Sequence, residues 1–186
     1  MVGDATLRPD DAEVVAEQLG RPPRSLRAVV HRCGCGLPDV VETAPRLADG
    51  SPFPTLFYLT CPRAAAAMSR LESGGLMRDM QRRLAADPAV REGQEAAHAD
   101  YLARRDAAAR AAGVEPLPPA MQSAGGMPGR VKCLHAMAAH ELAAPGANPL
   151  GREAIEAAGQ WCADGPCVER PSLERPGRER PGGERP

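Results

Sequence analysis

Residues 26–60 have the sequence LRAVVHRCGCGLPDVVETAPRLADGSPFPTLFYLT, and this stretch contains all the segments that we predict to form strands. Three segments in it are predicted to be strands because they are rich in β-branched or aromatic residues: 26–35, 38–43 and 53–60. The connections between them are short and contain glycine, which favours antiparallel pairing. The stretch therefore predicts a small antiparallel three-stranded sheet.

Alanine-rich segments on both sides of this stretch predict helices. Asp10 and Gly20 are suited to begin and end a short helix before the sheet, and Pro62 suits the first turn of the helix that follows it. Further helices are predicted at 76–86, from Pro88 to near Gly113, at 130–143, and in a last short segment that carries Trp161 and Cys162. The expected fold class is α+β, with the sheet packed against several Ala-rich helices.

The chain divides into three parts by composition. Residues 1–9 are expected to be frayed, and residues 10–168 are expected to form a single globular domain. The motif Glu-Arg-Pro recurs in residues 169–186 with almost no apolar residue between the repeats. This tail is therefore predicted to be disordered.

Charge and hydropathy exclude several classes of function. The formal net charge is -1 and the aromatic content is 3%, whereas nucleic-acid binding usually needs a basic face with stacking aromatic residues. No apolar run is long enough to span a bilayer, and the first residues, MVGDATLRPDD, lack the apolar segment of a signal peptide. We therefore expect a cytoplasmic protein whose six cysteines are reduced.

Thiols near the ends of the predicted strands are candidate metal ligands. His31, Cys33 and Cys35 alternate along the first strand, so their side chains share one face. Cys61 lies where the third strand meets a predicted helix N-terminus, and it approaches the other thiols if the two strands share a sheet. Cysteine and histidine are the common ligands of zinc, and thiolates also bind iron.

Cys133 is the fourth predicted ligand. It lies in the first turn of the predicted helix 130–143, and His135 two residues further on is expected to point to roughly the opposite side. The predicted metal site for zinc or iron is therefore Cys33, Cys35, Cys61 and Cys133.

Two other interpretations of the thiols stay open. Free cysteine is often an ordinary buried side chain in Ala-rich helices. Alternatively, the helix N-terminus beside Cys61 stabilises a thiolate for redox or nucleophilic chemistry. Cys162 and Cys167, in WCADGPC, are interpreted as incidental thiols near the tail.

A glycine-rich loop, GGMPGRVK at residues 125–132, suggests a different function. Helix N-termini bind anions, and Arg130 and Lys132 could hold a phosphate or carboxylate there. The alternative is a plain capping loop, since no Gly-Lys-Ser/Thr follows as in a Walker A motif.

Much of the chain resembles a known family. The similar segments are VAEQLGRPPR (15–24), HRCGCGLPDVVETAPRL (31–47), DGSPFPTLFYLTCP (49–62), SRLESGGLMRDM (69–80), AHADYLARR (97–105), GGMPGRVKCLHAMAAHELA (125–143) and NPLG (148–151). Together they resemble the actinobacterial domain-of-unknown-function family 501. Relatives more often have Arg-Cys-Pro-x-Gly where this chain has Arg32–Gly36, which places Cys35 outside the family pattern.

The resemblance implies a cytoplasmic protein with no established activity or catalytic residues. It also implies a link to cell division, because genes of relatives often neighbour those of a septum-formation-initiator-like protein and an exopolyphosphatase. Three functions follow as hypotheses: a metal-binding protein, an enzyme or sensor for an anionic or phosphorylated ligand, and a non-catalytic partner of a cell-division protein.

Overall fold

The computed structural model describes residues 7–118, 121 and 124–168, and it has the predicted α+β fold. The predicted disordered tail, 169–186, and residues 1–6 lie outside the described residues. The elements in chain order are α1 (Asp11–Leu19), β1 (Leu26–Arg32), β2 (Pro38–Thr43), β3 (Phe57–Leu59), α2 (Pro62–Gly74), α3 (Leu76–Ala86), α4 (Pro88–Ala111), α5 (Leu134–Ala143) and α6 (Pro149–Ala158). Within the described part of the chain, no helix is long and apolar enough to cross a membrane.

The sheet has the strand order β1-β2-β3, and both neighbouring pairs are antiparallel. Val41 lies at the centre of this arrangement, opposite Val29 of β1 on one side and Tyr58 of β3 on the other. Because β2 runs against both neighbours, β1 and β3 run in the same direction. The chain therefore leaves β1 and β3 at the same end of the sheet, and this end carries Cys33 and Cys61.

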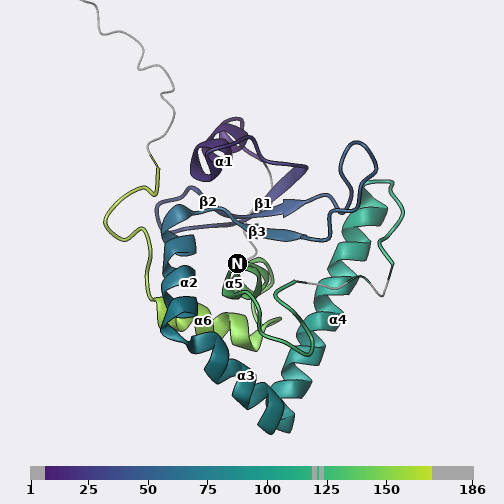
Figure 1. Cartoon of the computed structure of the whole chain (residues 1–186). Coiled ribbons are helices and arrows are strands. Elements are labelled where there is room, and N and C mark those ends of the chain that lie inside the picture. Colours follow the sequence, from purple (N-terminus) through teal and green to yellow (C-terminus); the bar gives the residue numbers. More distant parts are fainter. Residues whose placement is uncertain (1–6, 119–120, 122–123, 169–186) are drawn as a thin grey trace, which may run out of the picture.

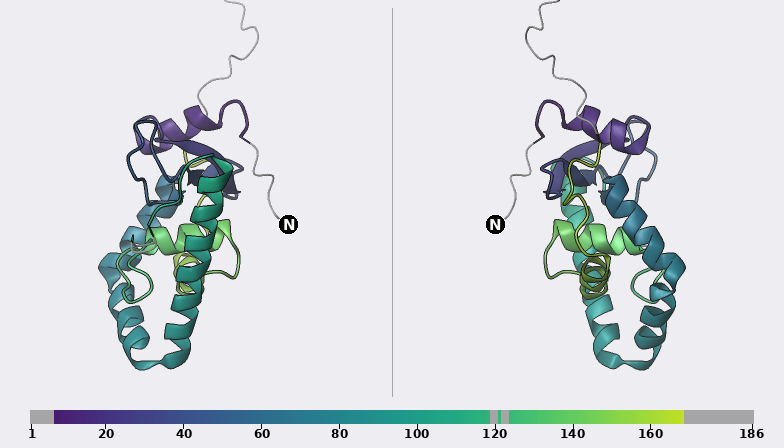
Figure 2. Two further views of the ribbon diagram at one scale, coloured as in Figure 1. Left: turned by 90° about the vertical axis from the view of Figure 1, so that its right-hand side faces the viewer. Right: turned by 90° about the vertical axis from the view of Figure 1, so that its left-hand side faces the viewer.

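Helices cover both faces of the sheet (Figure 1). On one face α1 packs through Val15, which forms a small apolar cluster with Val29 and Val41. On the other face lies α5, surrounded by α2, α4 and α6, and this side holds the main core. Helices α3 and α4 form a hairpin that extends away from the sheet (Figure 2).

A glycine fixes the crossing of α6 over α5. A Cβ atom at Gly151 would lie 2.2 Å from the carbonyl oxygen of Met137, so a larger residue would force the two helices apart. Asn148 begins α6, and its side chain accepts a hydrogen bond from the backbone N–H of Gly151 at 2.8 Å. The close approach at Gly151 thus fixes how the first turn of α6 packs on α5.

Several element boundaries differ from those predicted. The first strand ends at Arg32 because Cys33 begins a turn, and the third is limited to Phe57–Leu59. The last helix ends at Ala158, where Gly159 has a φ of 68°, so Trp161 and Cys162 follow the helix instead of lying in it.

The predicted helix 130–143 begins only at Leu134. The backbone N–H groups of Arg130 and Lys132 donate to the carbonyl oxygens of Gly126 and Gly125, at 3.0 and 2.7 Å. That of Val131 donates to the side chain of Gln81 at 2.9 Å. The loop is closed by these bonds, which is why helical geometry starts four residues later than predicted.

Candidate metal centre

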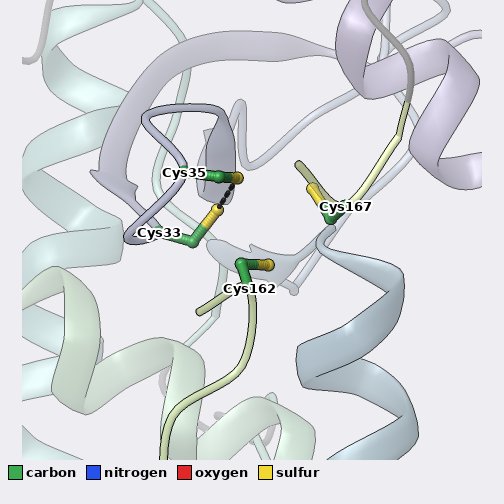
Figure 3. A group of neighbouring side chains, drawn as sticks. All are labelled: Cys33, Cys35, Cys162 and Cys167. Carbon is green, nitrogen blue, oxygen red and sulfur yellow. Dashed lines mark hydrogen bonds between the residues drawn. The ribbon is translucent and has the colours of Figure 1, made fainter. Parts of the chain in front are cut away.

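Four cysteines meet at the end of the sheet where β1 and β3 finish. The sulfur atoms of Cys33, Cys35, Cys162 and Cys167 all lie within 4.8 Å of one another, and we call them the four-thiol group (Figure 3). The sulfur atoms of Cys33 and Cys35 are 2.9 Å apart. Cys33 and Cys162 are buried, and Cys35 and Cys167 are half-buried.

The turn after β1 supplies the first two thiols. The backbone N–H of Cys33 donates to the carbonyl oxygen of Leu37 at 3.0 Å, and that of Gly36 donates to the carbonyl oxygen of Cys33 at 2.8 Å. Gly36 has a φ of 81°, a left-handed conformation that glycine adopts without a steric cost. The tight turn places Cys35 back over Cys33.

The segment after α6 supplies the other two thiols. Cys162 has a φ of 74°, which is unusual for a residue with a side chain and costs about 1 kcal/mol. The segment is held from outside, because Arg63 of α2 donates to the carbonyl oxygen of Gly165 at 3.1 Å. Gln18 of α1 donates through Nε2 to the sulfur of Cys167 at 3.3 Å.

Cys61, a predicted ligand, lies beside this group without belonging to it. It is fully buried, and its sulfur is 3.6 Å from that of Cys162. The parallel directions of β1 and β3 bring it to the same end of the sheet as Cys33. It is the residue immediately before α2.

The four thiols hold their protons unequally. A hydrogen bond to Cys61, followed by burial, raises the pKa of Cys33 well above its ordinary value, and burial also raises the pKa values of Cys162 and Cys167. Burial acts in the same direction on Cys35, but hydrogen bonds from Cys33 and from the backbone of Leu37 outweigh it and lower its pKa to about 7. At neutral pH, Cys35 is therefore partly ionised, and the other three thiols of the group keep their protons.

Cys133, the other predicted ligand, lies in a second group. Its sulfur, a ring nitrogen of His135 and a carboxylate oxygen of Glu72 lie within 4.8 Å of one another. The prediction that Cys133 and His135 point apart is wrong, because it assumed that both are helical. Cys133 precedes α5 in an extended conformation, with φ and ψ of -157° and 110°, so its side chain lies on the same side as His135.

A cavity of about 550 Å³ adjoins the four-thiol group and is lined in part by Cys33, Cys162 and Trp161. His31 and Asp39 also line it, and His31 Nδ1 lies 2.7 Å from Asp39 Oδ1. Asp39 is fully buried. A small polar pair thus borders the buried sulfur atoms.

Arg130 and Lys132 are exposed, as an anion site requires. However, the backbone N–H groups of both residues are bonded within the loop, and that of Leu134 at the start of α5 donates to Glu72 Oε1 at 2.7 Å. A carboxylate of the protein thus occupies the helix N-terminus. The described contacts are those of a capping loop, and the anion site stays a prediction.

A scan of family models finds one described as a protein of unknown function (DUF501), which matches residues 29–156. The chain belongs to this family. No curated protein and no solved structure matches the chain. The DUF501 match includes Cys33 and Cys35 but ends before Cys162 and Cys167.

Sequence reasoning missed the contribution of Cys162 and Cys167. The two are separated by four residues that include Gly165 and Pro166, a spacing that suits a turn between two ligands of one metal. Cys162 and Cys167 thus form a second pair of closely spaced cysteines that could complete a site with Cys33 and Cys35. Because this pair lies near the Glu-Arg-Pro repeats, its position in the sequence suggests an incidental role.

Proposed function

We propose that this DUF501 protein binds one metal ion, zinc in the first place, through Cys33, Cys35, Cys162 and Cys167. The observation that carries the proposal is the mutual approach of four sulfur atoms to within 4.8 Å. Four thiolates in a tetrahedral arrangement are typical of zinc or of a single iron ion.

The distances favour one ion over a cluster of several. Zinc–sulfur bonds of about 2.3 Å place tetrahedral sulfur atoms about 3.8 Å apart. The four-thiol group is close to this size, and binding requires that Cys33 and Cys35 separate from 2.9 Å. Gly34 lies between them and Gly36 follows, and a Cβ at either would meet nothing within 4 Å, so the turn has room to adjust.

The surroundings suit metal thiolates. Gln18 donates a hydrogen bond to the sulfur of Cys167, and a hydrogen bond with the backbone of Leu37 lowers the pKa of Cys35. Two sulfur atoms that would carry negative charge on a metal therefore already receive hydrogen bonds. Such outer contacts orient metal ligands and tune the site. Four protein ligands leave no position for substrate, which is the arrangement of a structural site.

The proposed role of the ion is to fasten the segment after α6 to the sheet. Residues 159–168 form no helix or strand in the structure, and few backbone bonds hold them. A metal that joins Cys162 and Cys167 to the turn after β1 would couple its binding free energy to folding. The proposal requires reduced thiols, as in the cytoplasm predicted from the sequence.

Elemental analysis of the untagged full-length protein, purified under reducing conditions, tests the proposal. We expect about one equivalent of zinc or iron per chain, and less than about a tenth of an equivalent in Cys33→Ser and Cys162→Ser. Cys133→Ser is the matched control and should keep the metal.

Cys61→Ser tests the boundary of the site. It should also retain the ion, because Cys61 neighbours the four-thiol group without completing it. A metal-free wild-type protein with all thiols reduced would overturn the proposal. Loss of metal in Cys133→Ser would show that the metal binds at Cys133 and not at the four-thiol group.

A further inference from the structure

The second group, Glu72, Cys133 and His135, has a defined hydrogen-bond pattern. His135 Nδ1 lies 3.1 Å from Glu72 Oε1, and its Nε2 lies 3.0 Å from the carbonyl oxygen of Ala65. A carboxylate and a carbonyl only accept hydrogen bonds, so both ring nitrogens must donate. A histidine that donates from both nitrogens is an imidazolium cation.

Glu72 is fixed in place by the backbone. Its Oε1 also accepts from the backbone N–H of Leu134 at 2.7 Å, which joins α2 to the start of α5. His135 is thus positioned by two helices, and its positive charge is held beside the sulfur of Cys133. The same residue, Cys133, lies directly before α5, where the helix dipole favours negative charge.

Cys133 and His135 border a cavity of about 610 Å³ on the face of β3 and α2. The other side chains that line it are uncharged and include Phe57, Leu59 and Pro62. Thr60 also lines it, is 2% exposed, and has a buried hydroxyl oxygen without a hydrogen-bond partner among the described residues. A buried hydroxyl without a partner is costly and indicates a place for a small polar ligand group.

We propose that Cys133 is a nucleophilic thiolate, held by the His135 imidazolium, that hydroperoxides entering this cavity oxidise to a sulfenic acid. Oxidation needs only a thiolate and access for the oxidant. Acyl transfer would also need free N–H donors for an oxyanion, and the N–H of Leu134 is already bonded to Glu72.

The oxidation consumes one hydroperoxide molecule for each Cys133 thiolate. A sulfur lone pair of Cys133 attacks the terminal oxygen of ROOH, the S–O bond forms and the O–O bond breaks. The alkoxide takes a proton from water and leaves as ROH, with hydroxide as the other product. Sulfur is oxidised by two electrons, and the peroxide is reduced by two.

The acid–base properties agree with this geometry. Burial raises the pKa of Cys133, but the His135 ring and the backbone of Ala136 outweigh it, so the net pKa is lowered. The Cys133 sulfur is the main cause that raises the pKa of His135, to about 9, with a further contribution from Glu72 against the effect of burial.

This inference is independent of the proposed metal site, because Cys133 is not among the four thiols. The same three side chains could instead hold a metal ion. Both ring nitrogens of His135 are engaged as donors, however, so no lone pair is directed at a metal. The experiment separates these two uses of the group.

Residue-specific alkylation of the reduced, zinc-loaded full-length protein tests the thiolate. Iodoacetamide is added over a pH series, and peptide mapping gives the rate at each cysteine. At neutral pH we expect Cys133 to react at least about tenfold faster than in the denatured chain, with its midpoint at lower pH. His135→Gln should slow this reaction about tenfold at neutral pH and hardly change it at high pH, where any thiol is ionised.

Hydrogen peroxide and tert-butyl hydroperoxide, followed by dimedone, test the oxidation. We expect a dimedone adduct at Cys133 in the wild type, and much less in His135→Gln. Thermal melting checks that His135→Gln folds. If the variant does not fold, the pH midpoint of Cys133 alkylation in the wild type tests the proposal by itself. The proposal is overturned if the alkylation midpoint of Cys133 equals that of the denatured chain, or if Cys133 is alkylated rapidly but forms no dimedone adduct. It is also overturned if the protein binds a second equivalent of zinc that is lost in Cys133→Ser.

Discussion

The four-thiol group and the group of Glu72, Cys133 and His135 both contain cysteine thiols, but their surroundings shift most of the thiol pKa values in opposite directions. In the four-thiol group, Cys33 and its neighbours lie in turns and loops, and most of their pKa values are raised. In the second group, Cys133 lies at the start of a helix beside a histidine, and its pKa is lowered. The first group needs an external cation to ionise fully, whereas the second carries its cation in the protein.

The imidazolium beside Cys133 accounts for much of the contrast, because burial acts to raise the pKa of a thiol in either group. Cys33 and Cys133 are both largely shielded, and burial raises the pKa of each. In the four-thiol group, burial raises the pKa values of Cys162 and Cys167, and a hydrogen bond to Cys61 followed by burial raises that of Cys33. Of the four, only Cys35 has a lowered pKa. A thiol beside an imidazolium ionises, so one group suits a metal and the other suits a reactive thiolate.

The two groups should differ most in how zinc changes the stability of the protein. Zinc at a thousand times its Kd should raise the free energy of unfolding by about 4 kcal/mol, since only the folded chain brings the four thiols together. Urea denaturation with and without zinc, under reducing conditions, measures this gain. Cys162→Ser should lose the gain and Cys133→Ser should keep it, and an equal gain in both variants would contradict the comparison.

The pH dependence of metal affinity should follow the thiol pKa values. Cys33, Cys162 and Cys167 have raised pKa values and must lose their protons to bind metal, whereas the Cys35 thiol, with a pKa of about 7, is already partly ionised. We therefore expect release of at least about three protons per ion at neutral pH, and an affinity that falls about a thousandfold for each unit of decreasing pH. Competition with a chromophoric chelator at two pH values measures the slope, and a pH-independent Kd would refute the proposed ligands.

A smaller effect is expected from a contact outside the ligands. Gln18→Leu removes the N–H group that donates to the sulfur of Cys167, which should weaken zinc binding about tenfold. Gln81→Leu, which instead removes a glutamine oxygen that accepts from the backbone N–H of Val131, is the matched control and should bind zinc like the wild type. The same chelator competition compares the two, and equal affinities would show that the contact with Cys167 does not tune the site.

The smallest effect is expected from the charged pair at the second group. The raised pKa of His135 gives stability that is present below its ordinary value of 6.5 and lost as pH rises through about 9. The lowered pKa of Cys133 gives stability that is lost as pH falls through the folded value. Near neutral pH, the free energy of unfolding of the wild type should thus be about 1 kcal/mol higher than that of His135→Gln. The difference is small because Cys133 and His135 are partly exposed and solvent screens their charges. Urea denaturation over a pH series measures this, and a difference that does not shrink at high pH would argue against the pair.

Local features of the fold were predictable because they depend on neighbours in sequence. The second strand, 38–43, and the helices Asp11–Leu19 and Leu76–Ala86 have the predicted limits. Glycine or proline marks most of these limits, and such residues act on the backbone directly. The start of α5 was not predictable, because the preceding N–H groups are bonded to a loop and to Gln81 of another helix.

The α+β class, the membership in DUF501 and the short glycine-containing connection between the first two strands follow from the sequence alone. Which other thiols meet the turn of Cys33 and Cys35 depends on the tertiary structure. Cys162 and Cys167 reach that turn because Gly151 sets the crossing of α6 over α5 and Arg63 holds the following segment. Contacts across so many residues depend on how whole elements pack, and the side-chain types along one chain do not specify that packing.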